Sequence, residues 1–309
     1  MTSDLPARAV LRPDALIEGW SDPEIARLVR SGAWTRLRRG VYLTGAPPAE
    51  AAERHRLLVH ATLATLRHPA VVSHQSAAVL LGLPLWNVPL DKVHITRRPP
   101  GYSGSSAVLR SHIARLREDE VIPMGPYAVT SRVRTALDLA RSLPFGTAVV
   151  ALDAALQAGA LSQEVLRQRV FDVSATRGGR AAARAVAFAD GRSESVGESR
   201  SRVLLHALGL MPTALQHEIR TPDGALVGRT DVAWEAERVV GEFDGRIKYG
   251  RLLKPGQEPG DAVFEEKRRE DAIRDEGWGV VRWTWRDLSA PHHVGERVRR
   301  ALDRGRASR

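Results

Sequence analysis

Residues 1–46 combine short amphipathic stretches with turn-forming residues. The pattern predicts a first short helix and then a second one, whose start is marked by the capping-box spacing of Ser21 and Glu24. Apolar positions 25, 28 and 29 give this second helix one hydrophobic face. Apolar and polar residues then alternate over residues 34–43 on both sides of Arg39-Gly40, which predicts a tight hairpin. Two helices and a hairpin in this order predict a winged helix-turn-helix.

Residues 47–190 mix helical and strand-like patterns, so we expect a mixed α/β region. Short apolar runs between helical stretches predict strands at 71–73, 93–96, 108–112 and 127–129. Thr130 is expected to cap a helix carrying Arg134 and Asp138, whose i,i+4 spacing predicts an ion pair on the helix surface or at an interface. His74-Gln75-Ser76 is interpreted as a helix start.

Residues 191–309 follow the order α-β-β-β-α-β-α. Ser195 and Glu198 have capping-box spacing at the start of the first helix. The later elements are predicted at 216–221, 226–234, 238–245, 261–276, 280–285 and 292–304. The chain is therefore expected to be an α/β (α+β) protein with three domains, at 1–46, 47–190 and 191–309.

The composition excludes several classes of protein. With 309 residues, 43% of them hydrophobic and 27% charged, the chain fits a folded protein rather than a disordered or fibrous one. It contains no cysteine, which excludes disulfides, thiolate metal sites and a cysteine nucleophile. Its longest uncharged run, residues 68–90, is broken by prolines and polar residues, so no membrane span is predicted. Acids and prolines near the start argue against a signal peptide, and we expect a cytoplasmic protein.

Positive charge is concentrated in the first part of the chain. The net charge is +10; residues 1–190 hold 24 Lys/Arg against 16 Asp/Glu, and residues 191–309 hold 22 against 20. No acid occurs between residues 25 and 49, a segment that contains Arg27, Arg30, Arg36, Arg38 and Arg39. On a winged helix these side chains predict phosphate and groove contacts with double-stranded DNA, the last two near the wing tip. The alternative is a solvated basic face.

Acidic residues recur on the strands predicted in the C-terminal region. Asp231 lies on the second strand, and Glu242 and Asp244 share one face of the third. Carboxylates brought this close would raise one another's pKa values unless a cation joined them, and oxygen ligands suit Mg²⁺ or Mn²⁺. Such a site could hydrolyse a phosphodiester, with Glu198 as a further ligand and Lys248 stabilising charge. The alternative is a set of surface carboxylates on an exposed sheet edge.

The same region resembles a family of nucleases. Residues 193–288 are similar to the PD-(D/E)xK nuclease superfamily, and most to its very-short-patch-repair-endonuclease-like branch, through the stretches GESRSRVLLHALGL, RTDVAW, VVGEFDGRIKYG and EEKRREDAIRDEGWGVVRWTW. The resemblance implies an αβββαβ restriction-endonuclease-like fold with Glu198, Asp231 and Glu242 in the site. The lysine that the superfamily has two residues after the third-strand acid is replaced here by Asp244, and Lys248 or Lys267 would have to act in its place.

A second resemblance covers roughly residues 10–155. The stretch LIEGWSDPEIARLVRSGAWTRLRRGVYL is similar to the winged-helix domain of AbiEi-type antitoxins of type IV toxin–antitoxin systems, and VVSHQSAAVLLGLPLW and VTSRVRTALDLA resemble the segments that follow it. The resemblance implies DNA binding, repression of the protein's own promoter and a toxin partner.

Two functions remain open on the sequence. The first is a Mg²⁺- or Mn²⁺-dependent endonuclease whose winged helix docks on the DNA duplex. The second is a non-enzymatic antitoxin-like repressor that retains a degenerate nuclease fold as a scaffold. A third idea, RNA or a protein as the partner of the basic face, ranks last, because single-strand RNA readers offer stacking aromatics and only 5% of this chain is aromatic.

Overall fold

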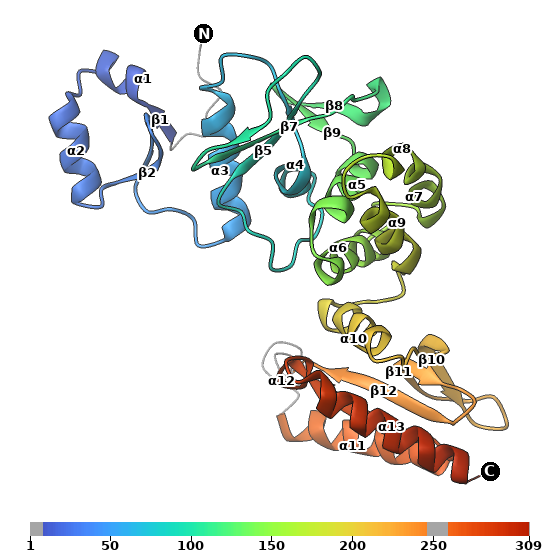
Figure 1. Cartoon of the computed structure of the whole chain (residues 1–309). Helices are drawn as coiled ribbons and strands as arrows, with labels where there is room; N and C mark the ends of the chain where they lie inside the picture. Colours follow the sequence, from blue (N-terminus) through green and yellow to red (C-terminus); the bar gives the residue numbers. More distant parts are fainter. Residues whose placement is uncertain (1–8, 246–258, 309) are drawn as a thin grey trace. The chain divides into compact units, whose positions relative to one another are not determined.

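The computed structural model describes residues 9–245 and 259–308, with the side chains of 259–266 excepted. This part of the chain contains three sheets and thirteen α-helices, as expected for the α/β (α+β) class (Figure 1). The chain divides into two compact units, one of residues 1–151 and 159–188 and the other of residues 152–158 and 189–309. None of the described helices combines the length and apolarity that crossing a membrane requires.

The first unit begins with the predicted winged helix. Its elements are β1 (Ala9–Leu11), α1 (Arg12–Ile17), α2 (Asp22–Arg30), β2 (Trp34–Arg38) and β3 (Val41–Thr44). The strands form an antiparallel sheet in the order β1-β3-β2, and Arg38 pairs with Val41 across the tight turn, which confirms the hairpin. The capping box is also confirmed, because the Ser21 backbone N–H donates to Glu24 Oε2 over 2.8 Å. Ile25 and Trp34 form the small core.

The rest of the first unit is built on a six-stranded mixed sheet, in the order β6-β7-β5-β4-β9-β8. Its strands are β4 (Val71–Val72), β5 (Val93–Arg97), β6 (Gly104–Ser105), β7 (Leu109–Ile113), β8 (Val121–Met124) and β9 (Tyr127–Thr130). Its helices are α3 (Ala51–Leu63), α4 (His74–Leu80), α5 (Arg132–Ser142), the first part of α6 (Phe145–Gln157), α7 (Gln163–Arg169), α8 (Phe171–Ser174) and α9 (Gly179–Phe188); the end of α6, from residue 152, belongs to the second unit. The four predicted strands are present. The edge strands β6 and β8 were missed, because β6 is two exposed residues and β8 contains Pro123, which argues against a strand.

One prediction for this region was wrong, and a second was correct only in part, because the i,i+4 ion pair that it named is present but buried. The cap of α5 is Ser131, whose side chain accepts from the Arg134 N–H, and Thr130 is the last residue of β9. The ion pair between Arg134 and Asp138 is not on a surface. Its Nε–Oδ1 distance is 3.1 Å, and the two side chains are 5% and 0% exposed. Glu120 also accepts from Arg134 Nη1 at 3.0 Å, so this guanidinium is buried between two carboxylates.

The second unit has the predicted order of elements, with one additional helical turn. It comprises α10 (Val196–Ala207), β10 (Ala214–Arg220), β11 (Leu226–Trp234), β12 (Val239–Asp244), α11 (Pro259–Asp275), β13 (Gly279–Thr284), α12 (Trp285–Leu288) and α13 (Pro291–Ala307). The sheet order is β10-β11-β12-β13; the first three strands are antiparallel, and β12 and β13 are parallel.

Apolar side chains cover both faces of this sheet. One face packs against α10 and α13 through residues such as Leu205 and Val298, with Trp283 buried between them. The other packs against α11 through Ile273. Gly241 sits at the centre of β12 because a Cβ there would overlap the Trp283 ring. The sheet is therefore filled on both sides, and charged groups must lie at its margins.

Candidate functional site

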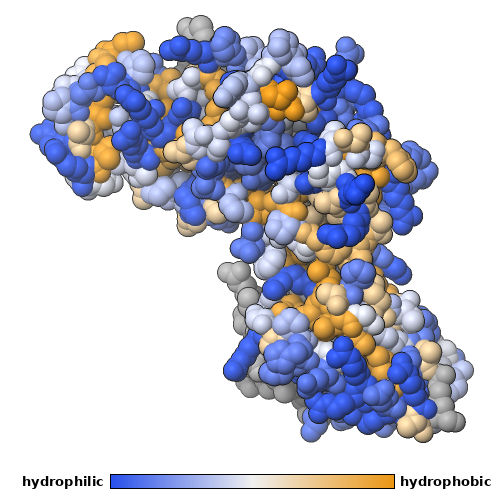
Figure 2. Space-filling view, viewed as in Figure 1, coloured by the Kyte–Doolittle hydropathy of each residue, from blue (hydrophilic) through white to orange (hydrophobic). Residues whose placement is uncertain are grey.

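Four exposed arginines lie on the second helix and the hairpin of the winged helix. Arg27 and Arg30 come from the last turn of α2, and Arg36 and Arg39 from the hairpin between β2 and β3. Among the residues that the structure describes, none of the four has an ion-pair partner. Figure 2 shows one face of the first unit, and hydrophilic side chains cover much of it. Guanidinium groups without carboxylate partners are available to phosphate oxygens, which supply most of the affinity for nucleic acid.

Arg38 differs from its neighbours on the hairpin. It is half-buried, and its Nη1 donates to the Thr62 carbonyl oxygen of α3 over 3.5 Å. Burial lowers the pKa of its guanidinium. Arg38 is thus directed against α3, whereas we expected it at the wing tip with Arg39. The alternation of residues along β2 could not predict the contact between Arg38 and α3, because α3 follows the winged helix in the sequence and is not part of the hairpin.

The predicted carboxylates of the second unit lie on β11 and β12. Ala233 pairs with Val240 across these strands, and both belong to the small core against Ile273 of α11. Directly opposed residues of an antiparallel pair point to the same face, and side chains alternate along each strand. Asp231 and Glu242 each lie two residues beyond that pair, so they share the face covered by α11.

Asp231 joins the two strands at the point where their ladder ends. Its Oδ2 accepts a hydrogen bond from the Phe243 backbone N–H over 2.7 Å. On the other side of β11, the ladder with β10 skips Gln216, which has φ of 51° and lies opposite Asp231. Asp231 therefore sits between an unpaired position in one neighbouring strand and the end of pairing with the other.

Glu242 is held by two arginines. The residue is 8% exposed, its Oε1 accepts from Arg269 Nη2 over 2.7 Å, and its Oε2 lies 2.9 Å from Arg282 Nη2. Arg282 also pairs with Glu270 of α11 at 3.1 Å. A row of alternating charges thus connects β12, β13 and α11, and Glu242 is neutralised within it.

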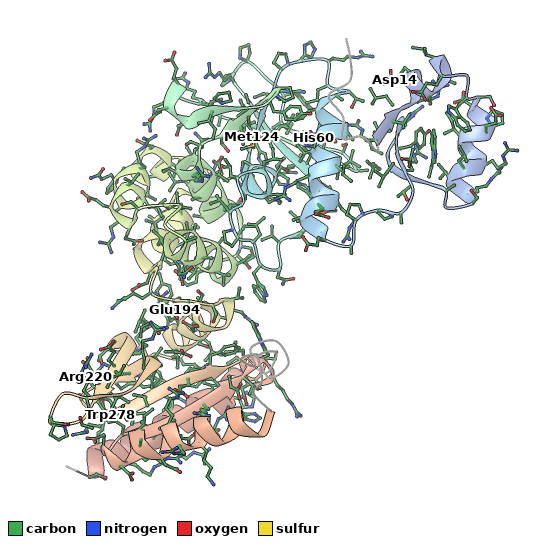
Figure 3. The ribbon with its side chains drawn as sticks, turned by 180° about the vertical axis from the view of Figure 1, so that it is seen from behind. Asp14, His60, Met124, Glu194, Arg220 and Trp278 are labelled. Atoms are coloured by element: carbon green, nitrogen blue, oxygen red, sulfur yellow. The ribbon has the colours of Figure 1, made fainter. Side chains whose placement is uncertain are left out.

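Glu198 stabilises the start of α10. Its Oε1 accepts from Ser195 Oγ at 2.7 Å, and its Oε2 accepts from the Glu194 N–H and from Gln216 Nε2, both at 2.8 Å. The prediction is confirmed in part: the Ser195 side chain caps α10 by accepting from the Glu198 N–H, but the reciprocal bond to Glu198 comes from the Glu194 N–H and not from that of Ser195. Gln216 connects this turn to β10 at the level of Asp231. Glu194, labelled in Figure 3, accepts from Arg229 at 2.9 Å.

These carboxylates do not form a ready metal site as the described side chains lie. Within the described part of the chain, one group of three His, Cys, Asp or Glu residues has ligand atoms within 4.8 Å of one another. That group lies in the first unit, not here. A divalent ion at Glu242 would have to displace Arg269 or Arg282. Asp244 ends β12, and Lys248 lies outside the described residues.

Sequence reasoning missed the two arginines that neutralise Glu242. Arg269 and Arg282 lie in the quoted stretch of α11 and β13, where they look like surface charges. It also missed a buried pair in the same unit, in which Asp153 Oδ2 accepts from Arg202 Nη1 over 2.7 Å. A signal was present in Arg202, a charge on the apolar face of an amphipathic helix, which requires a partner when it is buried.

Comparison with known proteins finds a family match for the first domain. Residues 8–45 match the family described as "Transcriptional regulator, AbiEi antitoxin", which covers the winged helix and its arginines. Two curated relatives are uncharacterized proteins of Mycobacterium tuberculosis, MT2308 of strain CDC 1551 and Rv2248 of strain H37Rv. Each is 30% identical over 178 residues, which cover 57% of this chain and 62% of the relative. The chain thus spans less than two thirds of the relatives' own length.

Comparison with solved structures gives one further alignment. The crystal structure of RV2827C protein from Mycobacterium tuberculosis aligns with a TM-score of 0.39 and 13% identity, over 70% of this chain and 84% of that one.

Proposed function

We propose that this protein is a cytoplasmic, DNA-binding transcriptional regulator of the AbiEi antitoxin type. The observation that carries the proposal is the match of residues 8–45 to that regulator family, over a winged helix whose exposed arginines on α2 and the hairpin have no ion-pair partner among the described residues. A helix and a wing that present cations to solvent are the parts with which winged helices contact the groove and the phosphate backbone. The promoter of its own gene is the proposed target, and a toxin encoded next to it is the proposed partner.

A mobility-shift titration on the DNA upstream of the gene tests this proposal. Arg27→Ala combined with Arg30→Ala removes two phosphate ligands, so affinity should fall and the slope of log K against log salt should decrease by about 2. The matched control is Arg167→Ala with Arg180→Ala, which removes the same charge from exposed positions on α7 and α9. Absence of a specific shift by the folded wild type, or equal losses in both double variants, would contradict DNA recognition by the winged helix.

The second candidate function is a Mg²⁺- or Mn²⁺-dependent DNA endonuclease in the C-terminal unit. It is favoured by one observation, the placement of Asp231 and Glu242 on a common face of adjacent strands. The ion pairs of Glu242 with Arg269 and Arg282 argue against it, because they occupy the carboxylate that would bind the metal. Plasmid nicking with either metal by the wild type, Asp231→Ala and Glu242→Ala decides the matter. An endonuclease loses cutting in both variants, whereas equal cutting by all three proteins identifies a contaminant and rejects the activity.

A further inference from the structure

Three histidines from separate elements of the first unit converge. His74 begins α4, His94 lies on β5, and His112 lies on β7. Because β5 and β7 are parallel neighbours in which His112 pairs with Thr96, His94 and His112 point to the same face two residues apart. One ring nitrogen from each histidine lies within 4.8 Å of the other two. Their convergence is a product of the fold, because no short sequence motif contains all three.

The spacing of the rings suits a common ligand. His94 Nδ1 and His112 Nε2 are 3.0 Å apart, and the rings of His74 and His112 stack with centroids 3.8 Å apart. Two nitrogens on one tetrahedral metal at 2.0–2.1 Å are separated by about 3.3 Å. Binding one ion therefore requires the nitrogens of His94 and His112 to separate by a few tenths of an ångström and the stacked rings of His74 and His112 to rotate, because a metal lies near the plane of each ring that it binds.

The protonation of the rings also suits a ligand role. Burial lowers the pKa of His94 to about 3 and that of His112 to about 4, and it holds the pKa of His74 well below its usual value. Neutral imidazole is the form that coordinates metals. His74 is buried, and His94 and His112 are half-buried.

Neighbouring polar groups hold two of the rings. Ser73 Oγ lies 3.0 Å from His74 Nδ1, which leaves Nε2 of that ring for a ligand. The Gln75 side-chain amide lies 2.9 Å from His94 Nε2, which leaves Nδ1. Rings that ligate metals are usually fixed in this way through their second nitrogen. With a metal on His94 Nδ1, that ring carries its proton on Nε2, and the Gln75 carbonyl oxygen turns to accept it.

A buried carboxylate points at the same group. Asp138 is fully buried, and its Oδ1 accepts from Arg134 and Arg141 at 3.1 and 2.9 Å. Its Oδ2 lies 3.9 Å from His74 Nδ1 and has no hydrogen-bond partner within the described chain. A carboxylate behind a ligating histidine strengthens it as a donor, and a cation beside His74 would draw in this unsatisfied oxygen.

We propose that His74, His94 and His112 bind one divalent transition-metal ion of the zinc type. Three imidazoles and no thiolate are a donor set for zinc and its neighbours rather than for magnesium or calcium. Water takes the fourth position. The ion ties the start of α4 to β5 and β7 and so stabilises the sheet. This site is independent of the proposed DNA binding and of the carboxylates on β11 and β12.

Metal titration of the full-length protein tests the site. Protein stripped with a chelator is titrated with Zn²⁺ by calorimetry and with Co²⁺ by visible ligand-field absorption. We expect one ion per chain and a higher thermal midpoint with Zn²⁺. His112→Gln and His94→Gln alter half-exposed ligands and should lower affinity by about 100-fold or more, and Gln75→Ala by about 10–100-fold. The double variant His292→Gln with His293→Gln, on α13, should bind as the wild type does.

Circular dichroism on each variant separates loss of the site from loss of the fold. Failure of the folded wild type to bind Zn²⁺ and Co²⁺ would overturn the proposal and leave the three rings as a hydrogen-bonded cluster. Unchanged affinity in a folded His112→Gln variant would overturn it too, as would loss of the ion from the control on α13.

Discussion

Glu242 on β12 and Arg282 on β13 lie opposite each other in the parallel pair and are joined by a 2.9 Å ion pair. Arg269 of α11 reaches the other oxygen of the same carboxylate. A helix and two strands are thus connected through one nearly buried acid. The arrangement explains how a carboxylate can remain on the margin of a packed sheet without a metal ion.

Glu242→Gln should therefore destabilise the second unit. The substitution keeps the shape of the side chain but leaves Arg269 and Arg282 without an anion, and we expect a loss of about 2 kcal/mol in the free energy of unfolding. Urea denaturation measures it. The control is Glu218→Gln on β10, whose pair with Arg220 is exposed on both sides and should contribute less than about 1 kcal/mol. Equal effects of the two substitutions would show that Glu242 is not the centre of this network.

The strand pattern was sufficient to place the acids, but not their partners. Capping boxes at Ser21 and Ser195 and the alternation along β11 are local signals, and each predicted its element to within a residue or two. The arginine contacts of Glu242 depend on the register of β12 against β13 and on how α11 crosses the sheet. Both are set by packing over long sequence distances, which a local pattern does not encode.

Local sequence patterns also could not predict that His74, His94 and His112 lie together. The sequence interpretation of His74 as a helix start is confirmed, because α4 begins there. Its ring meets His94 and His112 only after two parallel strands and a helix have been brought together. Metal motifs that can be found in a sequence have ligands at short, fixed spacings, and these three histidines lie far apart in the chain.

His60 should make the stability of the first unit depend on pH. Its Nδ1 lies 2.8 Å from the Tyr127 hydroxyl, which connects α3 to β9, and burial lowers its pKa below the usual value (Figure 3 labels His60). The folded state therefore favours the neutral ring, to which the hydroxyl can donate. The stabilisation is present above the unfolded pKa of about 6.5 and is lost as pH falls below it toward the folded value.

Urea midpoints at pH 7.5 and pH 5.5 measure this dependence. We expect His60→Gln to reduce the difference between the two midpoints, since glutamine does not titrate. His68→Gln, an exposed position shortly after the same helix, should leave the difference as it is in the wild type. A difference that is unchanged in His60→Gln would assign the acid sensitivity to another group.

The buried pair of Asp153 and Arg202 should contribute to the stability of the second unit only as a pair. The residues are 0% and 4% exposed, and Asp153 also accepts from the Asp190 N–H at 2.8 Å. Asp153→Ala leaves a buried guanidinium without its carboxylate and should cost about 3–5 kcal/mol. Asp153→Leu combined with Arg202→Met should cost less than the sum of the two single substitutions, because it removes the carboxylate and the guanidinium together; the Asp190 N–H loses its acceptor in both the single and the double variant. Additive losses in the double-mutant cycle would contradict this interpretation.

The adjacent arginines of the wing should have separable roles, if the protein binds DNA as proposed. Arg39 is exposed at the turn and has no ion-pair partner among the described residues, whereas Arg38 donates to Thr62 of α3. Arg39→Ala should lower DNA affinity, reduce the salt slope by about 1 and leave the thermal midpoint unchanged. Arg38→Ala should lower the thermal midpoint, because the hairpin loses its contact with α3, and should leave the salt slope unchanged. The two measurements on both variants distinguish a contact with phosphate from a contact within the fold, and reversed results would place Arg38, not Arg39, on the DNA.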